Sequence, residues 1–365
     1  MQKTRQFGIS VIEGDGIGPD VVQAAVAVLD ALQARFGGFA LRYEPVIAGA
    51  RYYRETGLEI ESGAFERLAG SDAILLGAIG LPDVRRPDGT EISPHLEVRD
   101  RFGLYAGVRP AKAYPNAPRR LLDERAAGID LVVLRESTEG LFFTQGRGEI
   151  SGDAEARETL RITRPTSEKL FDFAFRLARR RKARGGRGLV TCVDKANVFR
   201  AFAFFRKIFD ERRAAFADID AGYAYVDAMA LDLIRHPWDF DVLVTENMFG
   251  DILSDLTAAL VGGMGIASCG EIGDAHALFQ PAHGSAPDIV GQDRANPLAT
   301  ILSAGLMLDY LGERHDEPLM LEAAQLLDRV VTDGFAERDF LPVEFGGRDG
   351  TRAVTRAIVA RIARY

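Results

Sequence analysis

Few cysteines and no long apolar run limit what this chain can be. Its 365 residues include only Cys192 and Cys269, too few for a disulfide framework and typical of a reducing, cytoplasmic setting. No apolar run is long enough to span a membrane, and no segment has the pattern of a signal peptide. Acidic residues outnumber basic ones, and the net charge of −8 argues against nucleic acid and anionic membranes as partners.

One basic stretch departs from this balance. RLARRRKARGGRG covers residues 176–188. Cations stabilise the last turn of a helix because they complement its dipole. We therefore predict that this stretch ends a helix rather than binding nucleic acid.

The sequence also lacks a dinucleotide fingerprint, although its start invites the comparison. An apolar run leads into GDGIGP at residues 14–19. The Rossmann signature G-x-G-x-x-G needs its third glycine three positions after the second. Gly14, Gly16 and Gly18 are spaced two and two instead. Another arrangement must hold any cofactor.

Apolar runs typical of strands alternate with segments of helical periodicity. Strands are predicted at residues 9–13, 41–49, 72–80, 129–136, 188–194 and 240–246. Helices are predicted at residues 19–36, 296–312, 317–335 and 350–364. The last helix contains Thr351 near its start, a residue suited to capping. This alternation predicts an α/β protein with a mostly parallel sheet and helices on both faces.

Three arginines are candidates for binding carboxylates. LEVRDRFGLYAGVRP contains Arg99 and Arg109, and LVVLRESTEG contains Arg135 at the end of an apolar strand. A guanidinium group can grip a carboxylate with two hydrogen bonds. Taken singly, however, none of the three outweighs the ordinary role of arginine in a surface ion pair.

Acidic residues recur in two neighbouring motifs. ENMFGDILSDLTAALVGG places Asp251 and Asp255 four positions apart, hence on one face of a helix. VDAMALDL adds Asp227. Paired carboxylates suit Mg²⁺ or Mn²⁺, which prefer oxygen ligands. The spacing is equally compatible with two acids that only complement a helix dipole.

Two further motifs could carry chemistry. Lys195 in VDKAN follows an apolar strand, where a partly desolvated lysine can act as a base or proton relay, or simply as an ion-pair partner. QPAHGSAPDIVGQDRANP is rich in small residues and contains His283, Asp288 and Asn296. Small residues let a ligand approach the backbone closely, although an ordinary surface loop has the same composition.

Together and in this order, these motifs resemble the β-decarboxylating dehydrogenases. The family includes 3-isopropylmalate, isocitrate, homoisocitrate and tartrate/D-malate dehydrogenases, and the resemblance runs from about Gly14 to Leu311. It implies a two-domain, non-Rossmann α/β fold of the isopropylmalate/isocitrate dehydrogenase type. Residues 1–106 and 263–365 would form a large cofactor-binding domain, and residues 107–262 a central domain for dimerisation, metal and substrate.

The resemblance also implies a role for each motif in a homodimer with shared active sites. Asp251 and Asp255 would bind the metal together with Asp227 of the partner subunit. Lys195, also from the partner, would help to remove the hydroxyl proton, and Asp227 would count as catalytic as well. Substrate would be bound by Ser93, Arg99, Arg109 and Arg135. The cofactor would be bound by Ile17, His283, Gly284, Ser285, Ala286, Asp288, Ile289 and Asn296.

The adenosine end of the cofactor site favours NAD. A carboxylate at Asp288 would accept a hydrogen bond from a free ribose 2′-hydroxyl and repel a 2′-phosphate, as in Rossmann enzymes. NADP-dependent members of the family typically carry Lys and Tyr where this chain has Asp288 and Ile289.

The substrate is harder to assign. Isopropylmalate enzymes usually carry a glutamate and paired leucines before the first arginine, where EISPHLEVR has Ile92, His95 and Leu96. Ser93 matches isocitrate enzymes, but their following asparagine is His95 here. VDAMA, NMFGDILSD and HGSAPDI favour 3-isopropylmalate, and thus leucine biosynthesis. Tartrate or D-malate, and isocitrate or homoisocitrate, are the alternatives.

One residue departs from the family's chemistry. The tyrosine that usually protonates the enol after decarboxylation is Phe142 here. Water or another group must supply that proton, or the usual decarboxylation is not completed. A second hypothesis is a non-catalytic regulatory subunit, but such subunits tend to lose the metal and base residues, which are all present here.

Overall fold

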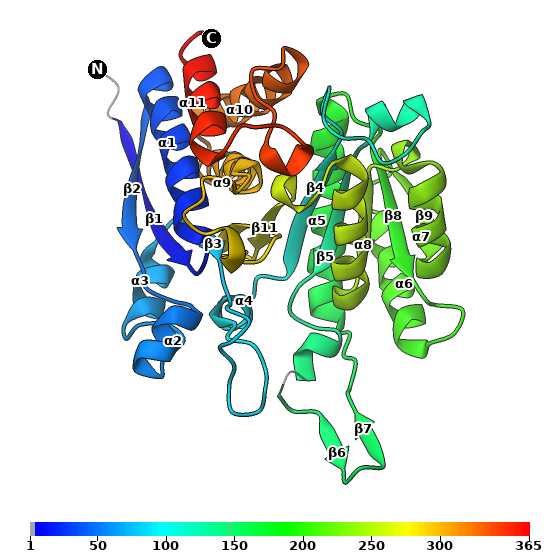
Figure 1. The fold of residues 1–365 in the computed structure, drawn as a ribbon. Helices are drawn as coiled ribbons and strands as arrows, with labels where there is room; N and C mark the ends of the chain where they lie inside the picture. The colour runs from blue at the N-terminus through cyan, green and yellow to red at the C-terminus, as the bar shows by residue number, and fades with distance from the viewer. Residues whose placement is uncertain (1–3, 145) are drawn as a thin grey trace.

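The computed structural model describes residues 4–144 and 146–365. A 10-stranded sheet crosses this part of the chain, with the order β2-β1-β3-β12-β11-β4-β5-β10-β8-β9 (Figure 1). The strands of the sheet are β1 (Arg5–Gly14), β2 (Phe39–Pro45), β3 (Ala73–Ala78), β4 (Ala106–Lys112), β5 (Asp130–Glu136), β8 (Leu189–Asp194), β9 (Asp220–Tyr225), β10 (Val242–Thr245), β11 (Ser268–Ile272) and β12 (Ala277–Pro281).

Helices cover both faces of this sheet. They are α1 (Gly18–Phe36), α2 (Ala50–Thr56), α3 (Ala64–Gly70), α4 (Pro94–Arg101), α5 (Arg164–Ala183), α6 (Arg200–Arg213), α7 (Val226–Arg235), α8 (Asn247–Val261), α9 (Leu298–His315), α10 (Pro318–Ala336) and α11 (Thr351–Ile362). Short 3-10 turns include η2 (Leu141–Thr144) and η5 (Pro287–Ile289).

The sheet is parallel at its two ends and antiparallel at its centre. Strand β11 runs antiparallel to both β12 and β4, and β4 runs antiparallel to β5. The other neighbouring pairs are parallel. The predicted mostly parallel α/β sheet is therefore confirmed, with three antiparallel pairings in the middle.

The two halves of the sheet come from different parts of the chain. Strands β1 to β3 join β11 and β12, so both chain ends build one half. The other half, β4-β5-β10-β8-β9, comes from the continuous segment 106–245. The two-domain division at residues 106/107 and 262/263 stays a prediction, and this strand order supports it.

Strand β5 shows why its sequence is almost wholly apolar. Leu131 and Val133 pack into a cluster with residues of α1, α9 and α10, whereas Val132 and Leu134 pack with α5 and α6. A strand that is covered on both faces needs apolar side chains at successive positions, not at alternate ones. The central strands are therefore held between two layers of helices.

The predicted elements are confirmed with small shifts at their ends, apart from one cap. The six predicted strands and four predicted helices are present, and the basic stretch ends α5. Thr351 does not cap α11: Gly350 is the N-cap, and the Thr351 hydroxyl donates to the Ala295 carbonyl at 2.6 Å. The buried hydroxyl bonds to a residue distant in sequence, whereas a capping hydroxyl would accept a hydrogen bond from a backbone N–H of its own helix.

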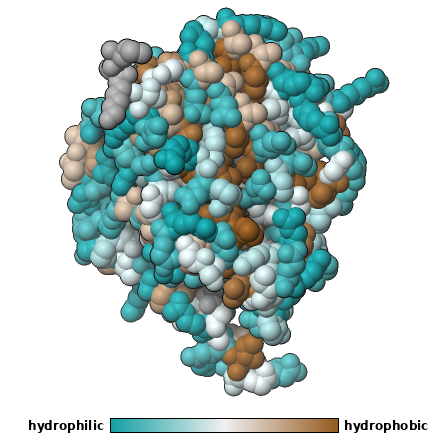
Figure 2. Space-filling view, turned by 90° about the vertical axis from the view of Figure 1, so that its left-hand side faces the viewer, coloured by the Kyte–Doolittle hydropathy of each residue, from teal (hydrophilic) through white to brown (hydrophobic). Residues whose placement is uncertain are grey.

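Strands β6 (Glu149–Ser151) and β7 (Glu155–Arg157) form a separate hairpin. It projects below the rest of the molecule, and a hydrophobic group is exposed on it (Figures 1 and 2). Ile150 in this hairpin is 80% exposed. Among the residues that the structure describes, none of the helices has both the length and the apolar character that a membrane span requires.

Candidate active site

The centre of the sheet carries a row of three facing residues. Arg135 on β5 lies opposite Gly107 on β4, and Gly107 lies opposite Glu271 on β11. A Cβ atom at Gly107 would stand 2.6 Å from the Ser137 hydroxyl oxygen and 3.0 Å from Glu271 Oε2. The glycine therefore leaves space over the sheet in which the neighbouring polar side chains meet.

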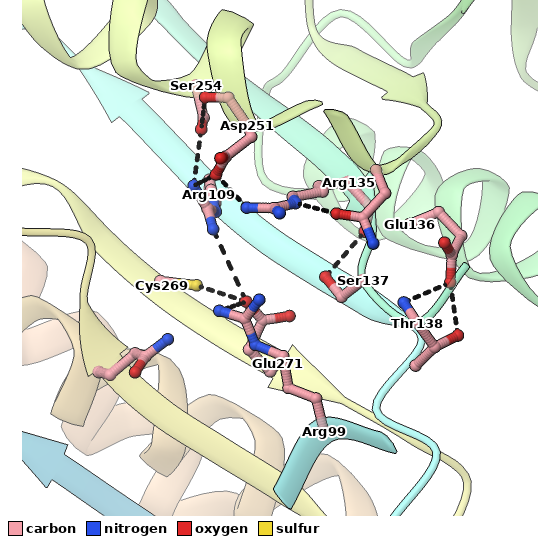
Figure 3. A network of polar contacts seen from close by, with 12 residues as sticks. Arg99, Arg109, Arg135, Glu136, Ser137, Thr138, Asp251, Ser254, Cys269 and Glu271 are labelled. Carbon is pink, nitrogen blue, oxygen red and sulfur yellow. Dashed lines mark hydrogen bonds and ion pairs between the residues drawn. The ribbon is translucent and has the colours of Figure 1, made fainter. Parts of the chain in front are cut away.

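Glu271 binds two of the predicted substrate arginines. Arg99, in the last turn of α4, places Nη2 2.9 Å from Glu271 Oε1, and Arg109 Nη2 lies 3.8 Å from the same oxygen (Figure 3). The Cys269 thiol donates to that oxygen as well, at 3.5 Å. The Glu271 side chain is fully buried. A buried carboxylate thus sits within the arginine cluster.

Helix α8 completes the cluster from the other side. Arg109 Nη1 donates to Ser254 Oγ at 2.8 Å and to Asp251 Oδ1 at 3.3 Å. Arg135 donates from Nε to Asn247 Oδ1 at 2.8 Å and forms an ion pair with Asp251. In Figure 3, Arg109 lies between Asp251 and Glu271. Residues from β4, β5, β11, α4 and α8 therefore converge on one place.

Charge and burial oppose each other in this cluster. Burial would raise the pKa of Glu271, but Arg99 and Arg109 outweigh it and lower the pKa to about 2. Burial, together with the neighbouring arginines, lowers the pKa of Arg135 to about 10. Three arginines therefore face the carboxylates of Glu271, Asp251 and Asp255. An anionic ligand could pair with the guanidinium groups wherever a cation neutralises the two aspartates of α8.

Ser93 and Leu96 at helix α4 lie in a cleft together with Phe142. Ser93 is at the N-cap position of α4, and its hydroxyl accepts a hydrogen bond from Arg86 at 3.2 Å. Ser93 lines a cleft of about 670 Å³ together with Leu96 and Phe142. Phe142 lies in η2, and its ring centre is 4.9 Å from the Arg135 guanidinium carbon. The arginine cluster therefore borders this cleft.

Asp251 and Asp255 lie on successive turns of α8. The helix starts where expected because the Glu246 carboxylate accepts hydrogen bonds from the backbone N–H groups of Met248 and Phe249. Asp255 is exposed, and partial desolvation still raises the pKa of its carboxyl group. Two carboxylates fit Mg²⁺ or Mn²⁺, which complete their shell with water, substrate oxygens or further carboxylates. The described residues of this chain contain no group of three His, Cys, Asp or Glu side chains that could hold a metal ion.

Lys195 and Asp227 form a separate ion pair. Lys195 follows β8, and Asp227 lies in the first turn of α7. The Lys195 side chain is 22% exposed and that of Asp227 is 69% exposed. Within residues 4–144 and 146–365, no ion pair links these two side chains to the arginine cluster.

The GDGIGP motif (residues 14–19) packs against the QPAHGSAPDIVGQDRANP motif (residues 280–297). The Ile17 N–H donates to the Ser285 carbonyl at 2.8 Å. Gly16 has φ +59°, and a Cβ there would stand 1.9 Å from the same carbonyl oxygen. The Asp15 carboxylate accepts hydrogen bonds from the Ala50 and Gly80 N–H groups and holds the turn. Gly16 therefore serves this contact, not a Rossmann turn.

A cavity of about 640 Å³ lies beside this contact. It is lined by six of the predicted cofactor residues: Ile17, His283, Gly284, Ala286, Ile289 and Asn296. Asp255 lines it too, so the cavity reaches the acidic face of α8. Asp288 is exposed in η5, and the buried Ser285 donates its hydroxyl hydrogen to the Gly80 carbonyl.

Sequence reasoning missed two acidic residues in these sites. Glu344 accepts a hydrogen bond from the Asn296 amide at 2.9 Å and so fixes that side chain. Glu271 was not anticipated either. Its one signal is a charged residue inside the short, otherwise uncharged strand SCGEI.

Comparison with known proteins supports the same assignment. The family model for isocitrate/isopropylmalate dehydrogenase matches residues 8–358. The chain belongs to the isocitrate/isopropylmalate dehydrogenase family. A 3-isopropylmalate dehydrogenase of Moorella thermoacetica is 38% identical over 98% of both chains. A 3-isopropylmalate/3-methylmalate dehydrogenase of Methanocaldococcus jannaschii is 40% identical over 97% of this chain and 98% of that protein.

Solved structures share the fold. Isocitrate dehydrogenase from Methylococcus capsulatus has a TM-score of 0.84 and 33% identity, covering 98% of this chain and 99% of that one. A β-decarboxylating dehydrogenase from Thermococcus kodakarensis has a TM-score of 0.79 and 37% identity, covering 98% and 96%. The predicted family and two-domain-type fold are confirmed, and the chain is a β-decarboxylating dehydrogenase.

Proposed function

We propose that this enzyme catalyses the NAD-dependent, Mg²⁺- or Mn²⁺-assisted oxidation and decarboxylation of a malate-type 2-hydroxy diacid. The observation that carries the proposal is the convergence of Arg99, Arg109 and Arg135 with the acidic face of α8. Buried guanidinium groups bind carboxylates, and two carboxylates define a diacid. The neighbouring Asp251 and Asp255 suit a divalent cation beside them.

The chain's own side chains then have distinct tasks. The arginines would orient the two carboxylates, and the buried setting would keep water away from the reacting carbon. Lys195, with Asp227 beside it, would take the proton of the C2 hydroxyl while the C2 hydride passes to NAD⁺. Cleavage of the bond to the β-carboxylate would then release CO₂. A bound divalent cation would polarise the hydroxyl oxygen and stabilise negative charge on it.

We propose NAD over NADP as the cofactor. Asp288 is exposed in η5, directly before Ile289, which lines the cavity together with His283 and Gly284. Its carboxylate would accept a hydrogen bond from a ribose 2′-hydroxyl, and its charge would repel a 2′-phosphate.

We propose a homodimer in which each active site uses both subunits. Lys195 is 22% exposed and Asp227 is 69% exposed, and in the described part of the chain no ion pair joins them to the arginine cluster. Nearby helices expose apolar side chains: Leu231 on α7 is 50% exposed and Ile252 on α8 is 62% exposed. Such an apolar surface on two helices is suited to burial against a second copy.

The first substrate to test is 3-isopropylmalate, because the relatives from M. thermoacetica and M. jannaschii carry that substrate in their names. D-malate, tartrate, isocitrate and homoisocitrate are the alternatives. Purified enzyme with NAD and Mn²⁺ should form NADH and CO₂ with at least one of these diacids, and a chelator should abolish both. If none of them reduces NAD, the proposal is wrong.

A further inference from the structure

The connection between β3 and α4 contains a turn that borders the cleft of about 670 Å³. The Arg86 N–H donates to the Thr90 carbonyl at 2.9 Å. The Asp88 carboxylate accepts from the Thr90 N–H at 2.9 Å and from the Thr90 hydroxyl at 2.7 Å. Arg86, Asp88 and Thr90 all line the cleft. The turn therefore holds the Arg86 side chain at the cleft wall.

The Arg86 side chain ties this turn to Glu59, which lies between α2 and α3. Its guanidinium group donates from Nε to Glu59 Oε1 at 2.6 Å and from Nη2 to Glu59 Oε2 at 2.8 Å. The two side chains are 28% and 21% exposed. The hydrogen bonds with Glu59 raise the pKa of Arg86. Two parallel hydrogen bonds between opposite charges are directional as well as strong, so they fix the orientation of both groups.

Both members of this pair also bind Ser93. Arg86 Nη2 donates to the Ser93 hydroxyl oxygen at 3.2 Å, and Glu59 Oε2 accepts from the Ser93 N–H at 3.2 Å. A serine at the N-cap of a helix ordinarily accepts a hydrogen bond from a backbone N–H of the first turn. Ser93 is the N-cap residue of α4, but among the described residues its side chain makes no capping hydrogen bond. The hydroxyl group is therefore held by Arg86 and not by the helix.

The hydrogen of the Ser93 hydroxyl has one weak acceptor. Within the described part of the chain, Ser93 Oγ donates only to the Glu91 carbonyl, at 3.3 Å. Ser93 is 7% exposed and lines the cleft together with Glu59, Arg86 and Phe142. A hydroxyl group donates one hydrogen bond and accepts up to two. A ligand oxygen in the cleft can therefore take this hydrogen while Arg86 keeps the Ser93 oxygen in place.

We infer that Glu59 and Arg86 are positioning residues, which orient Ser93 so that its hydroxyl donates to an oxygen atom of the diacid. Phe142, in the same cleft, has its ring centre 4.9 Å from the Arg135 guanidinium carbon, so Ser93 and the arginine cluster border one space. The inference rests on the proposed function and on the predicted role of Ser93 in binding substrate. It adds a pair of side chains that act on the diacid through Ser93.

A double-mutant cycle tests whether Arg86 acts through Ser93. We would measure KM and kcat with NAD, Mn²⁺ and the best-oxidised diacid among 3-isopropylmalate, D-malate, tartrate, isocitrate and homoisocitrate. Ser93→Ala and Arg86→Met should each raise the KM for the diacid by about 10-fold, as expected for one lost hydrogen bond to a charged group, and leave kcat little changed. The double variant should have the KM of Ser93→Ala alone, because Arg86 has no second route to the substrate.

Three outcomes would overturn the inference. The first is an unchanged KM in Ser93→Ala or in Arg86→Met. The second is a KM in the double variant of about 100 times the unmodified value, because effects that multiply come from residues that act independently. The third is full recovery of KM in Arg86→Lys, which keeps the charge but not the two parallel hydrogen bonds. If Arg86→Met does not fold, Glu59→Gln and Ser93→Ala form the same cycle.

Arg54→Met is the matched control. Arg54 on α2 forms an ion pair at 2.7 Å with Asp83, which belongs to the same connection between β3 and α4, and these side chains are 52% and 74% exposed. Arg54→Met should leave the KM for the diacid unchanged. A rise comparable to that in Arg86→Met would show that any anchor of this connection has the same effect, and the inference would be wrong. If the unmodified enzyme oxidises none of the diacids, the proposed function itself is wrong.

Discussion

The arginine cluster and the Lys195–Asp227 pair are both built from opposite charges, but they differ in burial. Arg99 and Glu271 have side chains 6% and 0% exposed, whereas Lys195 and Asp227 are 22% and 69% exposed. Buried charges are tolerated only with several partners, and here they come from five elements of one chain. An exposed pair contributes little to stability and is easily rearranged.

The difference in burial separates the arginine cluster, which one chain assembles by itself, from the exposed Lys195–Asp227 pair. The arginine cluster is assembled as soon as the central strands and α4 and α8 are in place. Within the described residues no ion pair joins the exposed pair to this cluster, and in the proposed dimer the pair would complete the site of the second subunit. The predictions below separate the two regions.

The largest effect is expected from removing one residue of each region. Lys195→Ala and Asp251→Asn should each lower kcat by about 10²-fold or more, because a proton acceptor or a metal ligand is lost. If the residues serve one site from different subunits, unfolding and refolding the two variants together should restore about a quarter of the activity, since half of random dimers are mixed and have one intact site. Mixed dimers without activity would place both residues in the site of one chain.

The next prediction concerns Asp288, the exposed residue beside the cavity of about 640 Å³. The enzyme should use NAD over NADP by about 100-fold or more in kcat/KM, because Asp288 repels a phosphate group. The double variant Asp288→Lys, Ile289→Tyr should narrow this gap without changing the KM for the diacid. Comparable kcat/KM values for NAD and NADP in the unmodified enzyme would contradict the assignment.

Phe142 tests the chemistry at the border of the buried cluster. If a phenol normally protonates the enol, Phe142→Tyr should accelerate CO₂ release or product tautomerisation, by at most about 10²–10⁴-fold. Single-turnover NADH formation should change little. If Phe142 instead packs against the substrate, the added hydroxyl should mainly raise KM. Measuring NADH and CO₂ in one reaction separates the two accounts, and equal rates for both products in both proteins would show that the missing phenol has no role.

The smallest effect concerns stability against pH. The pKa of Glu271 is about 2 in the folded state, below its ordinary value of 4.5. Its ionised form therefore stabilises the fold above pH 4.5, and this contribution disappears as the pH falls towards 2. The free energy of unfolding from urea titrations should fall more steeply between pH 5 and pH 3 (on the order of 1–3 kcal/mol) in the unmodified enzyme than in Glu271→Gln. In Asp227→Asn, which changes the exposed pair, the free energy of unfolding should depend on pH as it does in the unmodified enzyme. If Glu271→Gln also showed this same pH dependence, the ionised Glu271 carboxylate would not stabilise the fold.

Features that depend on local pattern could be predicted from the sequence. The apolar stripe of α1, the strand β5 and the four-residue spacing of Asp251 and Asp255 are examples. In each, neighbours along the chain set the geometry. The resemblance to the family further predicted that the three arginines and the aspartates of α8 belong to one site.

Features that depend on distant partners could not be predicted. Glu271 became part of the site because β11 lies antiparallel to β4, which no local pattern reveals. Strand β9 was missed because its sequence, DAGYAY, contains glycine and is only partly buried. Thr351 was assigned as a cap because its tertiary partner, Ala295, is far away in the sequence.

The unequal origin of the two sheet halves has a consequence for synthesis on the ribosome. Strands β4, β5, β8, β9 and β10 are all present once residue 245 has emerged, so this half can form while translation continues. The other half has to wait, because Ile74 on β3 pairs with Leu278 on β12 and α1 packs against α11, the last helix. Until then β3 has an open edge, and the cavity of about 640 Å³ between Ile17 and Asn296 does not exist. The nascent chain therefore gains the strands that carry Arg109 and Arg135 before this cavity can form.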